Sequence, residues 1–451
     1  SGSIDPNQVS DLSSLSFTGW ENATVSIYGA MGLSADTLIG SQVDDQIFGR
    51  EGDDLLEGGQ GADTLYGDSG NDTFFYGAPD QSHGAEFIQG GDGTADRILM
   101  DYDTDLSGAT IAGVEILDFR GDVIGSFQAS ALADVDTIYG NGPGISSLLE
   151  VFGTSGQDSV DFNAISFTNW GGFGSSDHVE MYGDQGNDSI LGSTGIDYLF
   201  GEAGNDTLTG GNNSDSLVGG PDNDSLVAGS GDADTVLGGL GNDTIVFDTY
   251  LTSADSVDGG DGEDWLLYTD ASNTAHLNGV VNVEHIVLGD ASTHIVTQDQ
   301  LVGSGQSLEI TLANPASGFG LTLYGQAETD GTLSVPGGIS SDGLYGGQGN
   351  DTLLGGAGND MLTGGPGADS LLGGANDDRF YVIDAGDASG DVIDGGLGSD
   401  SLFIQQDSDF TAGSLTGVEW IRLQASLTAT IDAEDLTDVV GIQGNSPGFA
   451  T

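Results

Sequence analysis

Large apolar residues recur at intervals of nine along three stretches of the chain, each two positions after an Asp and close behind one or more glycines. The first stretch contains the nonamers GSQVDDQIF, GREGDDLLE, GGQGADTLY and GDSGNDTFF in residues 40–75. Gly stands at or near positions one, two and four, Asp at position six and the apolar residue at position eight. This pattern predicts a tight turn followed by a two- or three-residue strand whose apolar side chain points inward. The inward residues of the first stretch are Ile47, Leu56, Leu65 and Phe74.

The second and third stretches repeat the same spacing. Two nonamers make one coil of a flattened spiral, so equivalent turns stack every eighteen residues. The inward residues of the second stretch are Ile190, Leu199, Leu208, Leu217, Leu226, Val236 and Ile245. Those of the third are Leu353, Leu362, Leu371 and Phe380. Further nonamers stand alone at 153–161, 259–267 and 395–403, with a stretched one at 90–98.

The turn residues have the chemistry of a calcium site. Glycines permit left-handed dihedrals and bring carbonyl oxygens close to an ion, and the Asp adds a hard, charged oxygen of the kind that Ca²⁺ prefers. The aspartates predicted to bind calcium are Asp36, Asp45, Asp54, Asp63, Asp72, Asp188, Asp197, Asp206, Asp215, Asp224, Asp234, Asp243, Asp264, Asp351, Asp360, Asp369, Asp378 and Asp400. The glycines predicted to form the sites are Gly49, Gly52, Gly58, Gly61, Gly67, Gly70, Gly183, Gly186, Gly192, Gly195, Gly201, Gly204, Gly346, Gly349, Gly355, Gly358, Gly364 and Gly367.

One ion is expected between each pair of stacked turns. In the first stretch, Asp36, Asp54 and Asp72 would stack along one edge, and Asp45 would stack over Asp63 on the other. Some nonamers depart from the pattern, and we expect weaker or empty sites at their turns. The departures are Val43, Ser214, Asp222 with Asn223, and Asn376.

On these nonamers the chain resembles the repeats-in-toxin (RTX) family of glycine-rich calcium-binding repeats. The resemblance implies an all-β fold with parallel β-roll (β-solenoid) blocks loaded with calcium. It also implies secretion by a type I system and folding outside the cell as calcium binds.

Composition supports a calcium-loaded chain. Five Arg, no Lys and 72 acidic residues give a net charge of −67, so a compact chain repels itself unless cations neutralise it. About ten or more Ca²⁺ ions, one for each stacked pair of turns, would remove much of this charge. We therefore expect a largely disordered calcium-free chain, with binding energy serving as folding energy. Halophilic adaptation, the competing explanation of the acidity, would scatter the acids rather than repeat them every nine residues, and is weighed as a minor addition.

The same composition excludes several partners, and the resemblance implies a location outside the cell. Five dispersed arginines cannot neutralise a row of phosphates, which excludes nucleic acid. No apolar stretch approaches the ~20 residues that span a bilayer. Cysteine is absent, so metal ions rather than disulfides would hold the chain together. We expect a secreted protein, extracellular or at the cell surface, whose partners are calcium and further copies of itself.

A longer repeat encloses the nonamers. Each calcium stretch is followed by a strand with a Val-Glu pair, namely GVEILDF at 113–119, NVEHIVL at 282–288 and GVEWIRL at 417–423. The sequence therefore predicts an elongated array of three tandem modules, each a calcium block with a flanking β-strand region. The modules are 1–145, 146–315 and 316–451, and their calcium blocks are about 31–76, 183–248 and 343–382.

The segments GNGPG (140–144) and GNSPG (444–448) correspond, but only the first leads into another module. One interpretation is that a neighbouring subunit supplies the continuation, which gives a head-to-tail, non-closing assembly such as a filament or a surface layer (S-layer). The other interpretation is a fragment of a longer array.

No catalytic constellation stands out, and we expect no enzymatic activity. The five histidines are scattered without a zinc-binding spacing, and paired carboxylates are too common here to indicate acid–base catalysis. The predicted function is therefore a calcium-dependent structural protein. Two alternatives remain: a calcium-dependent adhesin or carbohydrate-binding module that recognises a cell-surface glycan, and the non-catalytic repeat portion of a secreted enzyme or toxin.

Overall fold

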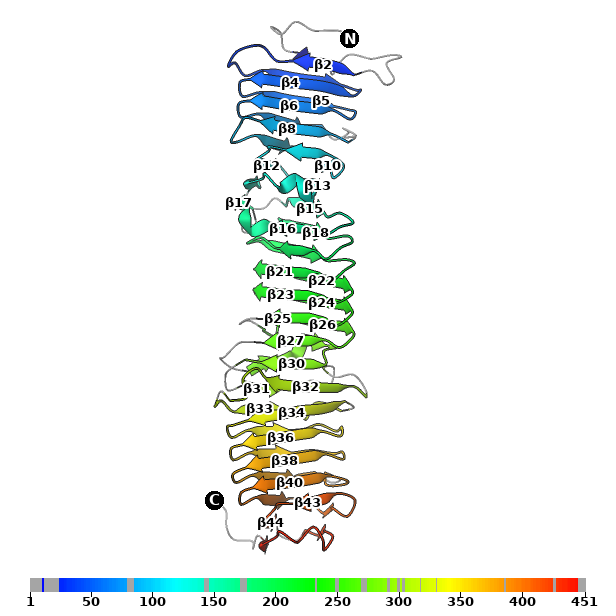
Figure 1. Cartoon of the computed structure of the whole chain (residues 1–451), viewed down its shortest axis with the longest axis vertical. Coiled ribbons are helices and arrows are strands. Elements are labelled where there is room, and N and C mark those ends of the chain that lie inside the picture. The colour runs from blue at the N-terminus through cyan, green and yellow to red at the C-terminus, as the bar shows by residue number, and fades with distance from the viewer. Residues whose placement is uncertain are drawn as a thin grey trace. The chain divides into compact units, whose positions relative to one another are not determined.

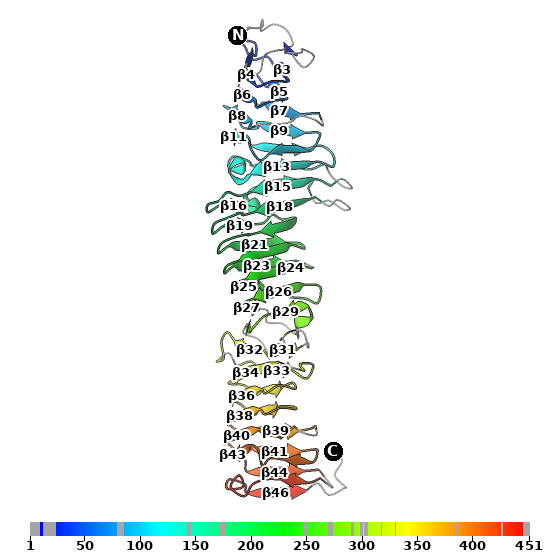
Figure 2. The same cartoon turned by 90° about the vertical axis from the view of Figure 1, so that its right-hand side faces the viewer.

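The computed structural model describes most of the chain as short parallel strands. The described residues are 10–11, 24–78, 85–141, 146–170, 177–231, 233–247, 251–268, 274–289, 293–297, 301, 305–316, 318–329, 331–384, 387–424 and 427–444. The GNGPG and GNSPG segments lie largely outside them. The chain divides into two compact units, Ser1–Pro221 and Asp222–Thr451. Within each unit the strands are stacked as successive rungs (Figures 1 and 2).

Two sheets form the first part of the N-terminal unit. One has the order β1 (Ser10–Asp11), β3 (Thr37–Ser41), β5 (Leu55–Gly59), β7 (Thr73–Tyr76), β9 (Arg97–Met100), β12 (Ile116–Phe119), β14 (Thr137–Tyr139) and β17 (Ser166–Thr168). The other has the order β2 (Val25–Tyr28), β4 (Asp45–Glu51), β6 (Thr64–Ser69), β8 (Phe87–Gly91) and β11 (Thr110–Ala112). Strands alternate between the two sheets along the chain, so one rung of each sheet makes one coil.

Two further sheets replace the second one after β11. One contains β10 (Thr104–Leu106), β13 (Ile124–Gln128), β15 (Leu148–Phe152), β18 (His178–Tyr182), β20 (Ile196–Phe200) and β22 (Ser216–Pro221). The other contains β16 (Ser159–Asp161), β19 (Ser189–Leu191) and β21 (Thr207–Asn212). Short 3₁₀-helices, η1 (Ala129–Leu132) and η2 (Phe162–Ala164), lie where the coils change from one pair of sheets to the next.

The C-terminal unit repeats this organisation. One long series of strands is β23 (Ser225–Ser230), β25 (Thr244–Phe247), β27 (Trp265–Tyr268), β30 (His285–Leu288), β32 (Ser307–Leu312), β34 (Thr332–Gly338), β36 (Thr352–Ala357), β38 (Ser370–Ala375), β40 (Val392–Leu397) and β43 (Ser414–Thr416). Facing it is first the series β24 (Thr235–Leu240), β26 (Ser256–Asp261) and β29 (Val280–Val281).

A second facing series begins with the strand that immediately precedes η3 (Leu277–Gly279). Its strands are β28 (Thr274–His276), β31 (Thr293–Val296), β33 (Leu321–Tyr324), β35 (Gly343–Tyr345), β37 (Met361–Thr363), β39 (Arg379–Val382), β41 (Ser401–Ile404), β44 (Trp420–Leu423) and β46 (Gly441–Gly444). Beside it, β42 (Ser408–Asp409) pairs with β45 (Ala429–Thr430).

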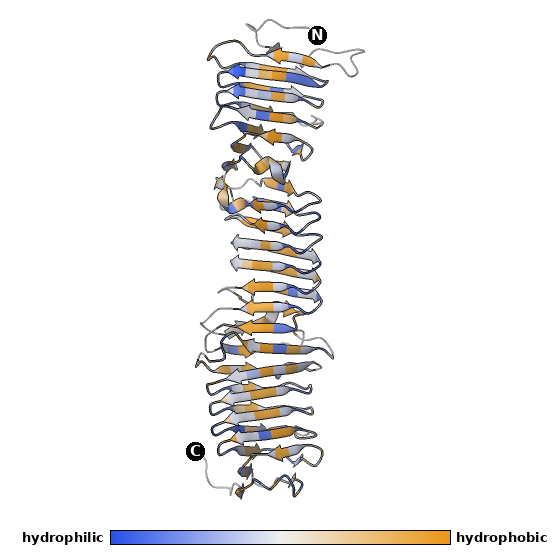
Figure 3. Cartoon of the chain, viewed as in Figure 1, coloured by the Kyte–Doolittle hydropathy of each residue, from blue (hydrophilic) through white to orange (hydrophobic). Residues whose placement is uncertain are grey.

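The predicted eighteen-residue coil is confirmed by the strand register. Leu38 pairs with Leu56, and Leu56 pairs with Phe74, in parallel. The predicted inward residues form the core, because Ile47, Leu56 and Phe74 have no exposed surface. Apolar and polar residues alternate along the strands (Figure 3). The all-β fold of parallel β-roll coils is therefore confirmed, while the division into three modules stays a prediction.

The strands are longer than predicted. The nonamer pattern predicted two or three residues per strand, but β4 runs over seven residues and β36 over six. The reason is that the main chain of the first glycines in the next nonamer continues the ladder, as shown by the pairing of Gly356 with Gly374. Glycine lacks a side chain to clash with the neighbouring rung, so pairing persists into the turn.

The expected flanking β regions also form coils. Phe74 pairs with Ile98, Ile98 with Leu117, and Leu117 with Ile138, so the same sheet continues beyond the first calcium block. Here the coils are longer than eighteen residues and contain additional strands such as β10 and β11. The calcium blocks and the regions between them therefore share one construction.

Candidate metal centre

Aspartates of successive coils are joined in rows by main-chain hydrogen bonds. The Asp36 N–H donates to Asp54 Oδ1 over 2.7 Å, and the Asp54 N–H donates to Asp72 Oδ1 over 2.8 Å. On the opposite edge, the Asp45 N–H donates to Asp63 Oδ1 over 2.7 Å. The structure thus brings these residues together in the stacked order that the sequence suggested.

The other predicted aspartates form rows of the same kind, together with some that were not predicted. In the N-terminal unit the donor–acceptor pairs are Asp158–Asp188, Asp188–Asp206 and Asp197–Asp215. In the C-terminal unit they are Asp224–Asp243, Asp243–Asp264, Asp234–Asp255, Asp342–Asp360, Asp360–Asp378, Asp378–Asp400, Asp351–Asp369 and Asp369–Asp391. The acceptor Asp of each pair therefore uses one carboxylate oxygen to bind the preceding coil.

The second carboxylate oxygen of most of these residues is buried without a hydrogen-bond donor. Asp72, Asp243 and Asp264 have no exposed surface, yet their Oδ2 atoms have no partner. The same holds for Oδ2 of Asp54, Asp63, Asp96, Asp188, Asp342, Asp360, Asp369, Asp378 and Asp400. A buried carboxylate oxygen without a donor is costly, so a cation is the natural partner for each of them.

Glycine at position one leaves the space that these oxygens face. A Cβ on Gly49 would lie 2.6 Å from Asp54 Oδ2 and 2.7 Å from the carbonyl oxygen of Gly67 in the next coil. A Cβ on Gly201 would likewise contact Asp206 Oδ2 and the Gly219 carbonyl. A side chain at this position would therefore fill the space between one carboxylate and one main-chain carbonyl.

Glycine at position four is needed for the shape of the turn. Gly52, Gly204 and Gly358 have φ of 127°, 132° and 137°, and a Cβ on each would meet a carbonyl oxygen of the preceding coil. Two residues that depart from the glycine pattern keep a left-handed backbone: Asp222 has φ 81° and Asn376 has φ 82°. Asp and Asn tolerate this region, so the turn survives these substitutions.

Two predicted residues have different surroundings. Asp36 is half-buried, and its Oδ2 accepts the Ala30 N–H over 2.5 Å. Gly195 lacks the left-handed φ, and a Cβ there would meet only Ser193 Oγ and the Trp170 ring, not a carbonyl of another coil. The turns at these positions thus differ from the others.

Burial raises the pKa of several row carboxyls. The pKa of Asp63 and of Asp72 rises to about 7, and that of Asp369 to about 8, chiefly because desolvation disfavours the charged form. Neighbouring row aspartates raise these pKa values further, while the hydrogen bond from the preceding coil lowers them. Rows of buried carboxyls without counter-ions are therefore electrostatically unfavourable at neutral pH.

The donor set fits a hard, oxygen-preferring cation. In the described part of the chain, no three acidic or histidine side chains converge on one point. The oxygens that do converge are carboxylates, one from each turn, and main-chain carbonyls, the ligand types that Ca²⁺ accepts. A bound Ca²⁺ would neutralise the buried carboxylates and link one coil to the next.

Three of the rows end at a Glu that was not among the predicted site residues. The N–H groups of Asp96, Asp264 and Asp400 donate to Oε2 of Glu115, Glu284 and Glu419 over 2.9, 2.9 and 2.7 Å. These are the glutamates of the three Val-Glu strands. Their recurrence was visible in the sequence, but their position in register with the aspartate rows was not.

Further aspartates belong to the rows although the prediction omitted them. They are Asp96, Asp158, Asp255, Asp342 and Asp391. The nonamers of Asp96, Asp255, Asp342 and Asp391 are stretched or lack glycine at position four, so the nine-residue step does not reach them, whereas Asp158 belongs to the isolated nonamer 153–161. The signal that could have found them is an Asp two residues before a buried apolar residue.

Comparison with known families agrees with this geometry. The RTX calcium-binding nonapeptide repeat (4 copies) matches residues 32–65, 39–74, 182–217, 209–245, 337–381 and 385–410. No curated protein sequence matches the chain. Most of the aspartate rows described above lie within the matched segments, and the parallel β-roll coils are the fold expected of such repeats. The chain therefore carries RTX calcium-binding nonapeptide repeats.

Proposed function

We propose that the chain is a secreted, non-enzymatic structural protein that folds when it binds Ca²⁺. The observation that carries the proposal is the set of buried Oδ2 atoms without donors, exemplified by Asp72 and Asp243. Such rows repeat through both units, so cation binding is coupled to the packing of coil on coil rather than confined to one local site.

Several features support a location outside the cell. The net charge of −67 requires many counter-ions, and calcium is abundant outside cells but scarce in the cytosol. The RTX repeats imply export by a type I system. None of the helices in the described residues has the length and apolar character needed to cross a membrane.

The coil construction supports the proposal of self-association into a filament or surface layer. Each coil binds the next through parallel main-chain pairing, and its two faces differ because the N–H of one Asp points to Oδ1 of the next. Contacts of this kind between chains are head-to-tail and do not close into a dimer. The proposed partners are therefore calcium and further copies of the chain.

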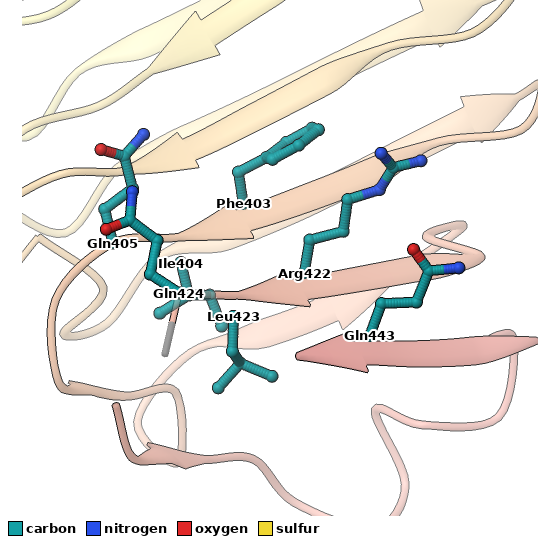
Figure 4. Close-up of a pocket in the computed structure, with 7 residues that line it drawn as sticks. All are labelled: Phe403, Ile404, Gln405, Arg422, Leu423, Gln424 and Gln443. Atoms are coloured by element: carbon teal, nitrogen blue, oxygen red, sulfur yellow. The ribbon is translucent and has the colours of Figure 1, made fainter. Parts of the chain in front are cut away.

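Surface aromatic side chains weigh against the alternative of a glycan-binding face. Tyr28, Phe48 and Tyr66 stack on one another with centroid distances of 5.0 and 4.9 Å, which covers ring faces that a sugar would need. Figure 4 shows the hollow of about 190 Å³ beside Phe403 and Arg422. There the Phe403 ring stacks on Tyr381, and the Arg422 guanidinium lies 5.1 Å from the ring centroid.

A calcium titration of the metal-free chain tests the proposal. Circular dichroism should show a gain of β structure, and sedimentation or electron microscopy of the same samples should show head-to-tail oligomers. Absence of any β gain would refute calcium-driven folding. A calcium-loaded chain that stays monomeric at high protein concentration would refute the assembly while leaving the folding intact.

A further inference from the structure

Most nonamer turns are of two kinds, which differ in the partner of the Asp Oδ2 atom; the turn of Asp36, whose Oδ2 accepts the Ala30 N–H, is outside both. In one kind this atom has no donor, as described above. In the other kind, the N–H of the position-two residue donates to it. The distances are 2.6 Å for Ser41–Asp45, 2.6 Å for Thr154–Asp158, 2.8 Å for Ser193–Asp197 and 2.7 Å for Gly347–Asp351. We name these four the sealed turns and the former the open turns.

Hydroxyl groups strengthen three of the sealed turns. Ser41 Oγ donates to Asp45 Oδ2 over 2.9 Å, and Thr154 Oγ1 donates to Asp158 Oδ2 over 3.0 Å. Ser193 Oγ lies 2.9 Å from Oδ1 and 3.1 Å from Oδ2 of Asp197. The Oδ2 atom of a sealed turn is thus satisfied by the protein alone, although Oδ1 of Asp45 is buried without a partner.

The backbone at position two separates the two kinds. In open turns this residue has a left-handed φ, for example 102° at Gly59 before Asp63 and 73° at Asp184 before Asp188. The same is true of non-glycine residues, such as Arg50 with φ 83° before Asp54. In the sealed turns the position-two residue has no left-handed φ. These residues are Ser41, Thr154, Ser193 and Gly347. Asp342 is intermediate, because its Oδ2 lacks a donor although Gly338 has no left-handed φ.

This difference decides which turns can bind a cation. An N–H that points at Oδ2 occupies the lone pair that a cation would use and places a positive hydrogen in the cation's position. A left-handed residue at position two turns its N–H away and leaves the oxygen free. Holding Arg50 in this region costs energy, which is expected where the conformation serves a site.

The sealed turns lie at the beginning of aspartate rows. Asp45 precedes Asp63, Asp158 precedes Asp188 and Asp206, and Asp351 precedes Asp369 and Asp391. The Glu115, Glu284 and Glu419 acceptors end other rows, which contain Asp72, Asp243 and Asp378. Protein groups thus satisfy the first turn in some rows and the final N–H in others.

We propose that the sealed turns do not bind calcium and act as metal-independent first rungs on which the calcium-binding open turns stack. The inference rests on the proposed calcium binding and refines it by assigning which turns hold ions. It also gives a sequence marker: Ser or Thr at nonamer position two, in place of a residue with left-handed φ, indicates a turn without an ion.

Counting bound ions in matched variants tests the assignment. Asp188→Asn alters an open turn and Asp197→Asn a sealed one, and both aspartates are buried in the N-terminal unit. Native mass spectrometry of the full chain in calcium should show at least one ion fewer for Asp188→Asn and the wild-type number for Asp197→Asn. Loss of an ion from Asp197→Asn, or no loss from Asp188→Asn, would overturn the proposal.

A second measurement covers variants that fail to fold. Ser193→Ala removes only the hydroxyl and should keep the wild-type number of ions. Anomalous scattering from crystals of the wild-type chain grown in calcium should show ions beside Asp188 and Asp243 but none beside Asp158 or Asp197. Ion density at the sealed turns would refute the inference, whereas a wild-type chain that binds no calcium at all would refute the proposed function instead.

Discussion

At the scale of the residue, one Asp joins three coils and still has an oxygen to offer. Asp54 accepts the Asp36 N–H at Oδ1, donates its own N–H to Asp72 Oδ1, and accepts the Thr73 N–H at its carbonyl. Its Oδ2 is left for a cation. The glycines around it leave room for that oxygen and permit the turn, so the nonamer requires both residue types at fixed positions.

Gly204→Ala should destabilise the calcium-loaded chain strongly. Gly204 has φ 132°, and a Cβ would collide with the Gly186 carbonyl of the preceding coil. Backbone strain alone costs about 1–3 kcal/mol, and the collision adds to it. Urea denaturation in saturating calcium measures the loss. Gly108→Ala is the control, because a Cβ there meets nothing within 4 Å; equal effects of the two variants would contradict this role of Gly204.

The raised pKa values predict that acid favours the metal-free fold. Asp63 and Asp72 have a folded-state pKa of about 7, above the unfolded value of about 3.9. Their ionisation therefore opposes folding, an effect that is absent below about pH 4 and complete above about pH 7. Chain dialysed free of calcium should gain β structure by circular dichroism as the pH falls from 8 to 5.

In the presence of calcium, a fall in pH should instead oppose folding, because protons compete with the ion for the same carboxylates. The calcium concentration at the folding midpoint should rise over the same interval. A midpoint that is independent of pH would show that these carboxyls do not bind the ion.

At the scale of the element, the coil is the unit that the sequence specifies best. The nine-residue step identified the core residues Leu56, Leu199 and Leu353, because the apolar position faces inward in every nonamer. It failed where coils lengthen, as between Ile138 and Phe167, because spacing no longer indicates which strands pair. It also could not distinguish sealed from open turns, since that distinction lies in the backbone direction at residues such as Ser193.

The glutamates that end three of the rows should stabilise the coil that contains the last Asp of each row. Glu419→Ala removes the acceptor of the Asp400 N–H and leaves a buried donor unpaired, at a cost of about 1–3 kcal/mol. Glu419→Gln keeps an acceptor oxygen and should cost less. Thermal unfolding in calcium would rank the two, with exposed Glu434→Ala as the neutral control. A Glu419→Ala variant as stable as the control would exclude this role.

At the scale of the whole molecule, two explanations of the acidity make different predictions about ions. If the net charge of −67 merely needs screening, any salt should promote folding, because 1 M monovalent salt shortens the Debye length to about 3 Å. If the open turns are metal sites, only a cation that several carboxylate and carbonyl oxygens can coordinate in irregular geometry will promote folding. Mg²⁺ demands near-octahedral geometry at about 2.0–2.1 Å and releases its waters reluctantly.

We therefore expect Ca²⁺ to fold the metal-free chain where Mg²⁺ and NaCl do not. Circular dichroism would be followed during separate titrations with CaCl₂, MgCl₂ and NaCl, the last raised to the ionic strength that screens the charge. In NaCl the chain should become more compact without gaining β structure. Salt screens the charge repulsion, but it supplies no partner to Oδ2 of Asp72 or Asp243. Full β structure in NaCl alone would mean that charge, not site geometry, governs folding, and the aspartate rows would then lose their assigned role.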